Sequence, residues 1–417
     1  MFQRTKRGSV STFGKKKYSE FKKRRSPGSA QGRPSNFRSS GQRGNRGKSY
    51  QQQIDVSRFV RKASTQKKDQ MYVAKHSFAD FNFCELLQRN LTKRNYPAPT
   101  PIQDQAITHI MNGRDLVGIS ITGSGKTGAF LLPLINKIFH DKSQKLLVIA
   151  PTRELAEQID TEFRHFSQGM NIFSALCIGG LPIYRQLGNL RQNPNVVIGT
   201  PGRLRDLSMR KAIKFESFKN IVIDEIDRML DMGFINIITD ILKEAHPKRQ
   251  SLFFSATIPD PIKRLVNQFL KEYITVEIVA HQSINNIDQD IVRCHDKTLK
   301  FSMLAKILAE PKTEKVLIFN ETKRDVEQLT RDLINKGFRA ESLHGDKRQR
   351  ERRRYLTQFR ENKINILVAT DVAARGLDIK DVTHVINYTI PQTYNDYIHR
   401  IGRTGRGDNK GTALTFV

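Results

Sequence analysis

A short glycine-containing stretch, Ser120-Ile-Thr-Gly-Ser-Gly-Lys-Thr127, constrains the fold of this chain more than any other feature. It follows an apolar run, residues 115–119, that is typical of a buried strand. It precedes residues 128–138, whose pattern predicts a helix packed on one face. A strand, a glycine loop, Lys-Thr and a helix form a phosphate-binding layout, because glycines let N–H groups close around a phosphate and the helix N-terminus is partially positive. The alternative is a glycine-rich turn without a ligand.

In a phosphate-binding loop the residues have distinct chemical roles. Lys126 would reach the β- and γ-phosphates of ATP, and the Thr127 hydroxyl would hold Mg²⁺. Ser120 stands where the general pattern has its first glycine. The other loop residues that we predict to bind ATP are Thr122, Gly123, Ser124 and Gly125.

From Phe78 onward, short continuous apolar runs alternate with amphipathic helical patterns. The first series has strand-like runs at 146–149, 196–198, 221–223 and 252–254, with helical patterns at 155–166 and 235–245. A second series follows residue 286, with runs at 316–319, 366–368 and 385–386 and helical patterns at 325–336 and 347–359. This alternation of apolar runs and amphipathic patterns predicts buried parallel strands that are covered by helices. We therefore expect two α/β domains, residues 74–282 and 283–417, of which only the first has a phosphate loop.

Residues 1–73 differ from the rest in composition. The whole chain has 71 Lys and Arg against 41 Asp and Glu, a net charge of +30, and residues 1–70 hold 20 of these bases against 3 acids. Such a segment buries too little apolar surface to offset its chain entropy, which predicts a disordered basic arm with one short helix at 54–60. Aromatic residues among the charges favour loose nucleic-acid binding. A solubilising tail is the alternative.

Charge and cysteine content narrow the cellular setting. The large positive charge indicates a polyanionic partner, either nucleic acid or an anionic membrane surface. No apolar run reaches the ~18 residues of a membrane span, and no apolar segment follows the basic N-terminus as in a secretory signal. Cys84, Cys177 and Cys294 lack metal-site spacing and are typical of a reducing compartment. We expect a cytoplasmic protein without a membrane partner, with a nuclear location as the alternative.

Two carboxylates end the apolar run at 221–223. Asp224 is in the position to hold Mg²⁺ through water, and Glu225 in the position to orient or activate an attacking water. Acidic residues at strand ends are common, but their place about 100 residues after the phosphate loop favours an NTPase.

Together with the next two residues, these carboxylates form Asp224-Glu-Ile-Asp227, which resembles the signature of the DEAD-box RNA helicases of superfamily 2. Further motifs of that family appear in order across residues 76–417: Pro99-Thr-Pro-Ile-Gln103, Pro151-Thr-Arg-Glu-Leu-Ala156, Gly179-Gly180, Thr200-Pro-Gly-Arg203, Ser255-Ala-Thr257, Leu317-Ile-Phe-Asn320, Ala369-Thr-Asp-Val-Ala-Ala-Arg-Gly-Leu-Asp378 and His399-Arg-Ile-Gly-Arg-Thr-Gly-Arg406. The resemblance implies two RecA-like domains in tandem.

The resemblance also implies roles around ATP. Gln103 would hydrogen-bond the adenine edge, Tyr96 would pack on the base, and Phe78 matches an isolated upstream aromatic. Arg403 and Arg406 would reach the γ-phosphate only when the two domains close, and Gly376 and Asp378 would lie near the ribose. Catalysis would then involve the following residues: Glu225, Lys126, Asp224, Arg403 and Arg406.

Other matching positions imply contacts with RNA and coupling between the ligands. The residues expected to bind the RNA backbone are Thr152, Arg153, Gly180, Thr200, Arg203, Gln349, Arg352, Thr370, Asp371 and Arg375. The residues expected to couple ATP to RNA are Asp227, Ser255, Thr257 and His399. For His399, a merely packed polar side chain is the alternative. Backbone contacts do not read bases, so sequence preference should be weak.

The chain departs from the family pattern at three points. Ile226 replaces the usual alanine and needs room for a larger side chain, whereas Ser120 replaces the loop's usual first alanine at small cost. The chain stops after an expected strand at 412–416, where the family continues through a helix, which puts the stability of the second domain in question.

These patterns favour an ATP-dependent RNA helicase, in which RNA-stimulated ATP hydrolysis drives local, largely sequence-independent unwinding. It would use ATP and Mg²⁺, act as a monomer, and meet ribosome-assembly or RNA-decay proteins. One alternative is an ATP-gated RNA clamp or scaffold with little turnover. Another is a related ATPase that acts on DNA.

Overall fold

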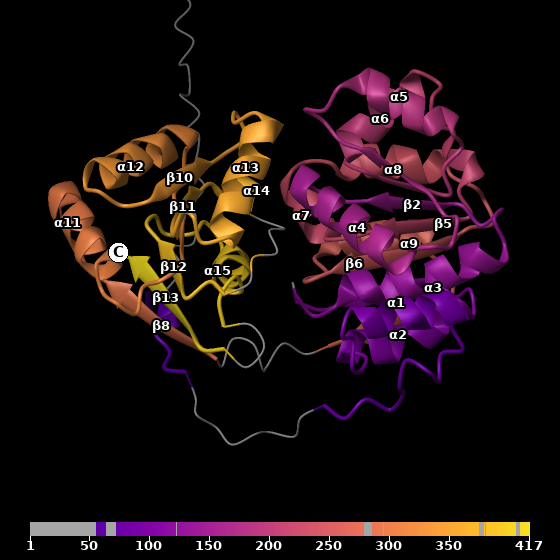
Figure 1. The fold of residues 1–417 in the computed structure, drawn as a ribbon, viewed down its shortest axis with the longest axis horizontal. Coiled ribbons are helices and arrows are strands. Elements are labelled where there is room, and N and C mark those ends of the chain that lie inside the picture. Colours follow the sequence, from indigo (N-terminus) through magenta and orange to yellow (C-terminus); the bar gives the residue numbers. More distant parts are fainter. Residues whose placement is uncertain are drawn as a thin grey trace, which may run out of the picture. The chain divides into compact units, whose positions relative to one another are not determined.

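The computed structural model describes residues 56–63, 72–121, 123–278, 286–294, 296–374, 379, 381–405 and 409–417. These residues form two parallel sheets with helices on both sides of each (Figure 1). The predicted pair of RecA-like α/β domains is confirmed. The arm predicted for residues 1–73 lies mostly outside the described residues, so its disorder and the domain boundaries stay predictions.

The first domain is built on a sheet with the strand order β3-β4-β2-β5-β6-β1-β7, and every pairing is parallel. Its strands are β1 Leu116–Ile119, β2 Leu146–Ile149, β3 Ser174–Cys177, β4 Val196–Gly199, β5 Asn220–Ile223, β6 Gln250–Ser255 and β7 Ile274–Glu277. Its helices are α1 Glu85–Lys93, α2 Pro101–Met111, α3 Lys126–His140, α4 Arg153–Phe166, α5 Ile183–Arg191, α6 Pro201–Met209, η2 Phe215–Ser217, α7 Ile226–Asp231, α8 Ile235–Glu244 and α9 Asp260–Phe269.

The second domain has the parallel order β10-β11-β9-β12-β13-β8. Its strands are β8 Ile287–Val292, β9 Val316–Phe319, β10 Ala340–Leu343, β11 Ile366–Ala369, β12 His384–Asn387 and β13 Gly411–Phe416. Its helices are α11 Lys297–Leu308, α12 Lys323–Asn335, α13 Gln349–Arg360, α14 Asp371–Ala374 and α15 Tyr394–Ile401. The terminal strand β13 pairs on both sides, with β12 and β8, so the last residues of the chain hold the sheet together.

Alternate residues of each central strand enter separate hydrophobic clusters on the two faces of the sheet. In β2, Leu146 and Val148 join one cluster and Leu147 and Ile149 the other. The strand β9 divides in the same way. This explains why the strands are continuous apolar runs, since a sheet covered on both faces has no polar side.

The topology brings the polar motif residues to one edge of each sheet, because all strands are parallel. The phosphate loop, Thr152, Thr200 and Asp224 directly follow the carboxyl ends of β1, β2, β4 and β5. In an open parallel sheet, ligands bind at this edge. Among the described residues, no helix has the length and apolar character needed to cross a bilayer.

The expected short helix near residues 54–60 is present as a 3-10 helix, η1 Val56–Phe59. Phe59 is fully buried in a cluster with residues of the second domain, among them Tyr397 and Ile401. Part of the segment that composition assigns to the arm is therefore packed, and composition did not reveal this because Phe59 is the buried side chain of the segment.

Gly118 lies in β1, the strand that leads into the phosphate loop, and its substitution gives a testable prediction. A Cβ at this position would lie 2.5 Å from the ring of Phe254 on β6, in a buried core. We expect Gly118→Ala to lower the free energy of unfolding by about 1–3 kcal/mol through overpacking. Urea unfolding of the full chain measures this, with Gly188→Ala as control, since Gly188 in α5 has open space around it. Equal midpoints for Gly118→Ala and the parent would contradict the prediction.

Candidate active site and nucleic-acid interface

The phosphate loop is shaped by Gly125 and the helix that follows it. Gly125 has a φ of +96° and precedes the first residue of α3. A Cβ there would lie 2.6 Å from Thr100 Oγ1 and 2.8 Å from Gln103 Nε2. Both the left-handed backbone and the close approach require glycine. The result is a helix N-terminus that faces the loop, as a phosphate site needs.

Lys126 is buried and its Nζ donates a hydrogen bond to the Ser120 carbonyl oxygen at 2.8 Å. The Ser120 and Ser124 hydroxyls lie 2.8 Å apart. The ammonium therefore lies across the loop, where a phosphate could replace the carbonyl as its partner. Thr122, which we predicted to contact ATP, lies outside the described residues.

Of the three residues predicted to hold adenine, Gln103 contacts the phosphate loop and the two aromatic residues pack against each other. Gln103 is buried, and its side chain accepts from the Thr100 N–H at 3.0 Å and donates to the Gly125 carbonyl at 3.0 Å. Phe78 packs edge-on against Tyr96, with ring centroids 6.2 Å apart. Gln103 thus ties the expected base pocket to the phosphate loop, and the adenine contact itself stays a prediction.

Asp224 and Glu225 follow β5 and are both buried. Burial raises the pKa of the Asp224 carboxyl although Lys126 acts in the opposite direction. Asp224 Oδ1 has no hydrogen-bond partner among the described residues, an unusual state for a buried oxygen. A hydrated cation would satisfy it, and Mg²⁺ usually keeps several waters and takes only one or two protein carboxylates. The residues present therefore fit Mg²⁺.

Glu225 has a left-handed backbone with a φ of +54°, which is uncommon for a residue other than glycine and frequent at functional sites. Burial opposes its ionisation, but Arg228, Lys126 and Arg403 lower the pKa of its carboxyl overall. Arg228 forms a buried ion pair with Glu225 that our reading of the sequence missed. The signal was available, since Arg228 lies one helical turn after Glu225. Ile226 is fully buried in the first domain's core, so the larger side chain is accommodated.

Two predicted residues of the second domain, Arg403 and His399, interact electrostatically with this cluster of charged residues. Arg403 is buried and lowers the pKa of Glu225. Burial lowers the pKa of His399, and Arg228 adds to this effect, so His399 is neutral near pH 7. Four other predicted positions, Arg375, Gly376, Asp378 and Arg406, lie outside the described residues.

Asp227 links the carboxylates to the end of β6. Its Oδ2 accepts from the Ala256 N–H at 3.1 Å, the Thr257 N–H at 2.9 Å and the Thr257 hydroxyl at 3.2 Å. The Ser255 carbonyl accepts from the Ser120 N–H at 3.0 Å, which joins the same turn to the phosphate loop. The residues predicted to couple ATP to RNA in the first domain are therefore in direct contact.

A cleft of about 410 Å³ brings together several residues predicted to bind RNA. Arg153 lies over Gly180, where a Cβ would be 2.6 Å from its Nη1. The predicted RNA-binding residues that line the cleft are Thr152, Arg153, Thr200, Arg203 and Arg352. Glu154 and Asp206 also line it, so the cleft is basic but not uniformly so.

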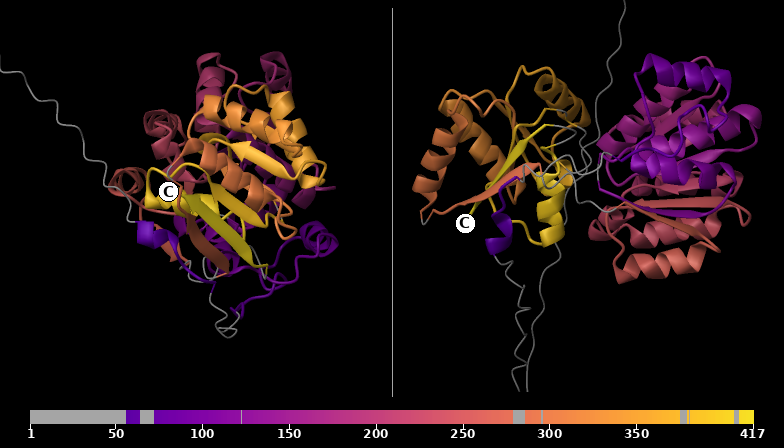
Figure 2. Two further views of the ribbon diagram at one scale, coloured as in Figure 1. Left: turned by 90° about the vertical axis from the view of Figure 1, so that its left-hand side faces the viewer. Right: turned by 90° about the horizontal axis from the view of Figure 1, so that it is seen from below.

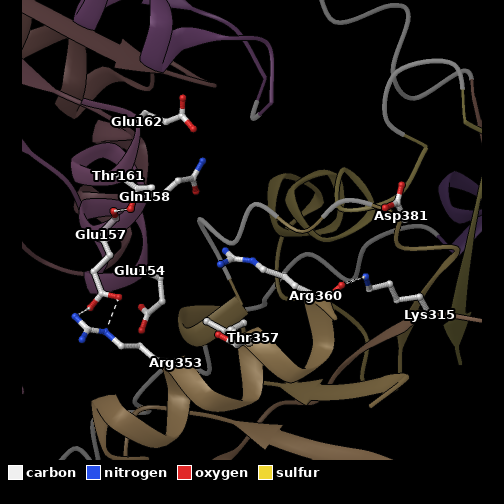
Figure 3. A pocket seen from close by; sticks show the side chains of 11 residues that line it. Glu154, Glu157, Gln158, Thr161, Glu162, Lys315, Arg353, Thr357, Arg360 and Asp381 are labelled. Carbon is white, nitrogen blue, oxygen red and sulfur yellow. Dashed lines mark hydrogen bonds and ion pairs between the residues drawn. The ribbon is translucent and has the colours of Figure 1, made fainter. Parts of the chain in front are cut away.

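Gln349 and Arg352 hydrogen-bond to carboxylates of α4. Gln349 Nε2 donates to Glu154 at 3.2 Å and Arg352 Nε donates to the same oxygen at 2.7 Å. A neighbouring cavity of about 560 Å³ has acidic residues of α4 on one side and Arg353 and Arg360 of α13 on the other. Figure 3 shows Arg353 paired with Glu157 there, at 2.7 Å. Gln349 and Arg352 would have to exchange these partners, at least in part, to bind RNA.

Asp371, another predicted RNA contact, is instead bound within the second domain. Its carboxylate pairs with both sides of the Arg400 guanidinium, at 2.7 Å and 2.6 Å. Arg400 is buried and also donates to Asn387 and to the Thr389 carbonyl. Thr370 precedes α14, and its carbonyl oxygen accepts from the Ala373 N–H at 3.0 Å and the Ala374 N–H at 2.9 Å. Asp371 thus holds the Arg400 side chain within the second domain, and a direct contact of Asp371 with RNA stays a prediction.

Comparison with known proteins identifies a matching family model for each of the two domains. Residues 100–265 match the family model described as DEAD/DEAH box helicase, and residues 299–408 match the helicase conserved C-terminal domain. The chain is similar to an ATP-dependent RNA helicase CshA of Listeria monocytogenes, 44% identical over 82% of this chain and 66% of the relative. It is similar to the CshA of Limosilactobacillus reuteri, 41% identical over 82% and 69%. The chain thus spans about two thirds of the length of these curated relatives.

Solved structures agree with the sequence comparison. Dbp5 of S. cerevisiae, bound to RNA and ADP BeF3, superposes with a TM-score of 0.75 at 30% identity, over 82% of this chain and 89% of that one. Mss116p bound to ssRNA and AMP-PNP gives a TM-score of 0.75 at 29% identity, over 86% and 76%.

Proposed function

Because this chain belongs to the DEAD-box helicase family, we propose that it is an ATP-dependent RNA helicase. In this proposal, hydrolysis of ATP between the two RecA-like domains is stimulated by RNA and drives local separation of RNA strands. The observation that carries the proposal is the buried Glu225, which forms an ion pair with Arg228 and whose carboxyl pKa is lowered by Arg228, Lys126 and the second-domain Arg403.

The chemistry follows from the residues around the loop. Lys126 would exchange the Ser120 carbonyl for a phosphate oxygen. Thr127 and Asp224 would hold Mg²⁺ through hydroxyl and water, and the ion would neutralise charge on the phosphates when bound. Glu225, kept ionised by its cationic neighbours, would orient the attacking water.

In this proposal, hydrolysis of ATP depends on closure of the second domain onto the first. An arginine at the γ-phosphate contributes ~10³–10⁵ in rate to phosphoryl transfer. Since Arg403 belongs to the second domain, its position depends on domain closure, and RNA that binds both domains would favour the closed form. The relatives Dbp5 and Mss116p, which were solved with RNA and nucleotide, support this ligand pair.

The RNA site would recognise backbone and not sequence. Arg153 beside Gly180, with Thr152, Thr200 and Arg203, offers donors for phosphates and 2′-hydroxyls on the first-domain side of the cleft. We expect weak sequence preference and a monomeric enzyme. Cytoplasmic action on ribosome assembly or RNA decay remains part of the proposal.

Strand separation tests the proposal. A short RNA duplex with a single-stranded overhang and a fluorophore–quencher pair reports unwinding. We expect release with ATP, no multiple-turnover release with AMP-PNP, and no effect of an all-DNA duplex as competitor. ATP-dependent retention of RNA without strand release would instead favour the clamp, and equal competition by DNA would favour a DNA-directed ATPase.

The basic arm gives a second prediction. Residues 1–53 hold 15 Lys and Arg against one Glu. Phosphate contacts release counterions, so affinity falls with salt in proportion to the number of contacts. We expect deletion of residues 1–53 to weaken RNA binding and to flatten the dependence of log K on log salt, as measured by anisotropy. An unchanged affinity and slope would show that the arm is only a solubilising tail.

A further inference from the structure

Asp104 is a buried carboxylate that directly follows Gln103 in the first turn of α2. It accepts hydrogen bonds from one short stretch of the preceding chain. The Tyr72 hydroxyl donates to Asp104 Oδ2 at 2.5 Å, and the Lys75 N–H donates to the same oxygen at 2.8 Å. His76 donates to Asp104 Oδ1 through its N–H at 3.1 Å and through its Nδ1 at 2.7 Å. Asp104 therefore anchors this stretch on α2.

Residue 104 has to be a carboxylate for this arrangement. An ionised carboxylate has two acceptor oxygens and no donor, whereas an amide of the same shape would turn an NH₂ group toward one pair of donors. Burial opposes ionisation of the Asp104 carboxyl, but hydrogen bonds from the anchored stretch, that of the Tyr72 hydroxyl first among them, lower its pKa overall. The first turn of a helix also favours a negative charge. The anchor thus depends on the charge of Asp104 as well as on its shape.

The anchored stretch leads directly into Phe78, one of the residues predicted to hold adenine. Phe78 is buried, and its ring centroid lies 6.2 Å from that of Tyr96 and 6.4 Å from that of Phe81. The His76 ring, held by Asp104, lies 5.5 Å from the Phe81 ring. Two residues of chain span at most about 7 Å. The hydrogen bonds of His76 therefore restrict where Phe78 can lie.

The other end of the segment is fixed to a second helix. The Ser77 N–H and hydroxyl donate to Asp80 Oδ2 at 2.6 Å and 2.9 Å, which closes a turn. The Cys84 N–H donates to Asn136 Oδ1 on α3 at 2.8 Å. The right panel of Figure 2 views the first domain from the side on which this indigo and violet segment lies. Residues 72–84 are thus held on α2 at one end and, at the other, on the helix that follows the phosphate loop.

Gln103 and Asp104 hold different parts of the expected ATP site. Neighbouring residues of a helix point in different directions. The Gln103 side chain donates to the Gly125 carbonyl of the phosphate loop at 3.0 Å, whereas Asp104 holds the segment that contains Phe78. We propose that Asp104 is a positioning residue of the ATP site, which holds Phe78 in place for adenine before the nucleotide binds. This inference rests on the proposed function, since it concerns the base of ATP.

The physical basis of the proposal is preorganisation of the base site. A segment that has to become ordered on binding lowers affinity, and a site that is competent in only a fraction of the molecules binds more weakly by that fraction. Release of the segment should therefore weaken binding of the base. The phosphate loop should keep its affinity, because Gln103 and α3 hold it and Asp104 does not. A purely structural role of Asp104 would instead weaken both parts of the site together.

Competition for a fluorescently labelled ATP, measured with Mg²⁺ in the full chain, tests the proposal. Unlabelled ATP reports on the whole site, and inorganic tripolyphosphate reports on the phosphate loop alone. Asp104→Asn removes the charge and one acceptor oxygen. The double variant Tyr72→Phe/His76→Ala removes two donors whose side chains are partly exposed, so the core stays intact. Asp160→Asn is the matched control, since Asp160 is a buried carboxylate of α4 with hydrogen-bond partners of its own.

We expect Asp104→Asn to weaken ATP binding roughly tenfold and the double variant to weaken it roughly threefold or more. Binding of tripolyphosphate should stay within about twofold of the parent in both, and Asp160→Asn should match the parent for both ligands. ATPase kinetics at saturating RNA should show the same division, with a raised KM for ATP and an unchanged kcat.

ATP affinity equal to that of the parent in Asp104→Asn would overturn the proposal. An equal loss of ATP and tripolyphosphate affinity in both variants would also overturn it, because Asp104 would then only stabilise the domain. If Asp104→Asn alone lost both ligands, the double variant would decide: a loss confined to ATP supports the proposal, and parent-like affinity overturns it. Failure of the parent itself to bind ATP would overturn the proposed function and this inference with it, so the two failures are distinguishable.

Discussion

Glu225→Gln is expected to abolish RNA-stimulated phosphate release while ATP still binds. Glu225 is buried, and Arg228, Lys126 and Arg403 lower the pKa of its carboxyl, so it is ionised at neutral pH and able to accept a proton from water. Glutamine has nearly the same shape but cannot accept that proton. Removing a positioned general base typically costs a factor of about 10²–10⁴ in rate.

Single-turnover phosphate release at saturating RNA measures this change, and fluorescence binding of a labelled ATP measures affinity. Glu216→Gln is a matched control, because Glu216 lies in η2 at the surface of the same domain. A rate within threefold of the parent would remove Glu225 from the hydrolytic step. It would leave Asp224, which follows the same strand, as the remaining acidic candidate.

Arg403→Ala is expected to have the largest effect of any substitution outside the phosphate loop. An arginine that stabilises charge on the transferred phosphoryl group contributes ~10³–10⁵ in rate. Arg403 is buried and acts on Glu225 from the second domain. We expect Arg403→Lys to fail as well, since an ammonium on a different stem does not reproduce the planar guanidinium.

The signature of this role is a loss of turnover without a loss of ATP binding, because the first domain holds the phosphate loop on its own. RNA-stimulated ATPase kinetics separate the two quantities, with the exposed Arg331→Ala in α12 as control. If Arg403→Ala raised only the KM for ATP and left kcat intact, the arginine would be a ground-state ligand. The proposal that hydrolysis depends on closure of the two domains would then lose its basis.

Much of the fold was predictable because its central strands are covered on both faces. The runs 146–149, 221–223, 316–319 and 366–368 were found from apolar content alone and correspond to β2, β5, β9 and β11. The strands that were missed, such as β8 with its sequence Ile-Asp-Gln-Asp-Ile-Val and β10 with Ala-Glu-Ser-Leu, lie at sheet edges. Edge strands contain polar residues, so the same criterion does not detect them.

Helix ends were predicted less well than helix centres. The pattern placed the helix after the phosphate loop at residues 128–138, whereas α3 begins at Lys126 and ends at His140. Hydrophobic periodicity cannot detect Lys126, which faces the loop, or the start set by the left-handed Gly125. The capping geometry, and not the apolar face, fixes where this helix begins.

The site was predictable where a motif is local and less so where contacts cross the chain. The contact of Asp227 with Thr257 follows from two recognised motifs. The pair Arg228–Glu225 involves an arginine just after the signature motif, and the pair Arg400–Asp371 joins two separate motifs, so neither pair follows from a single motif. Phe59 was hidden within a basic segment, and only its burial reveals the contact.

Phosphate release from ATP by the full chain, with and without single-stranded RNA at one fixed salt concentration, tests the central claim most directly. The two-domain account predicts slow release alone and strong stimulation by RNA, with no comparable stimulation by single-stranded DNA of the same sequence. Fast release that does not respond to RNA would contradict the account, because Arg403 would then reach the nucleotide without closure. Bound ATP with no release in either condition would also contradict it and would favour the RNA clamp.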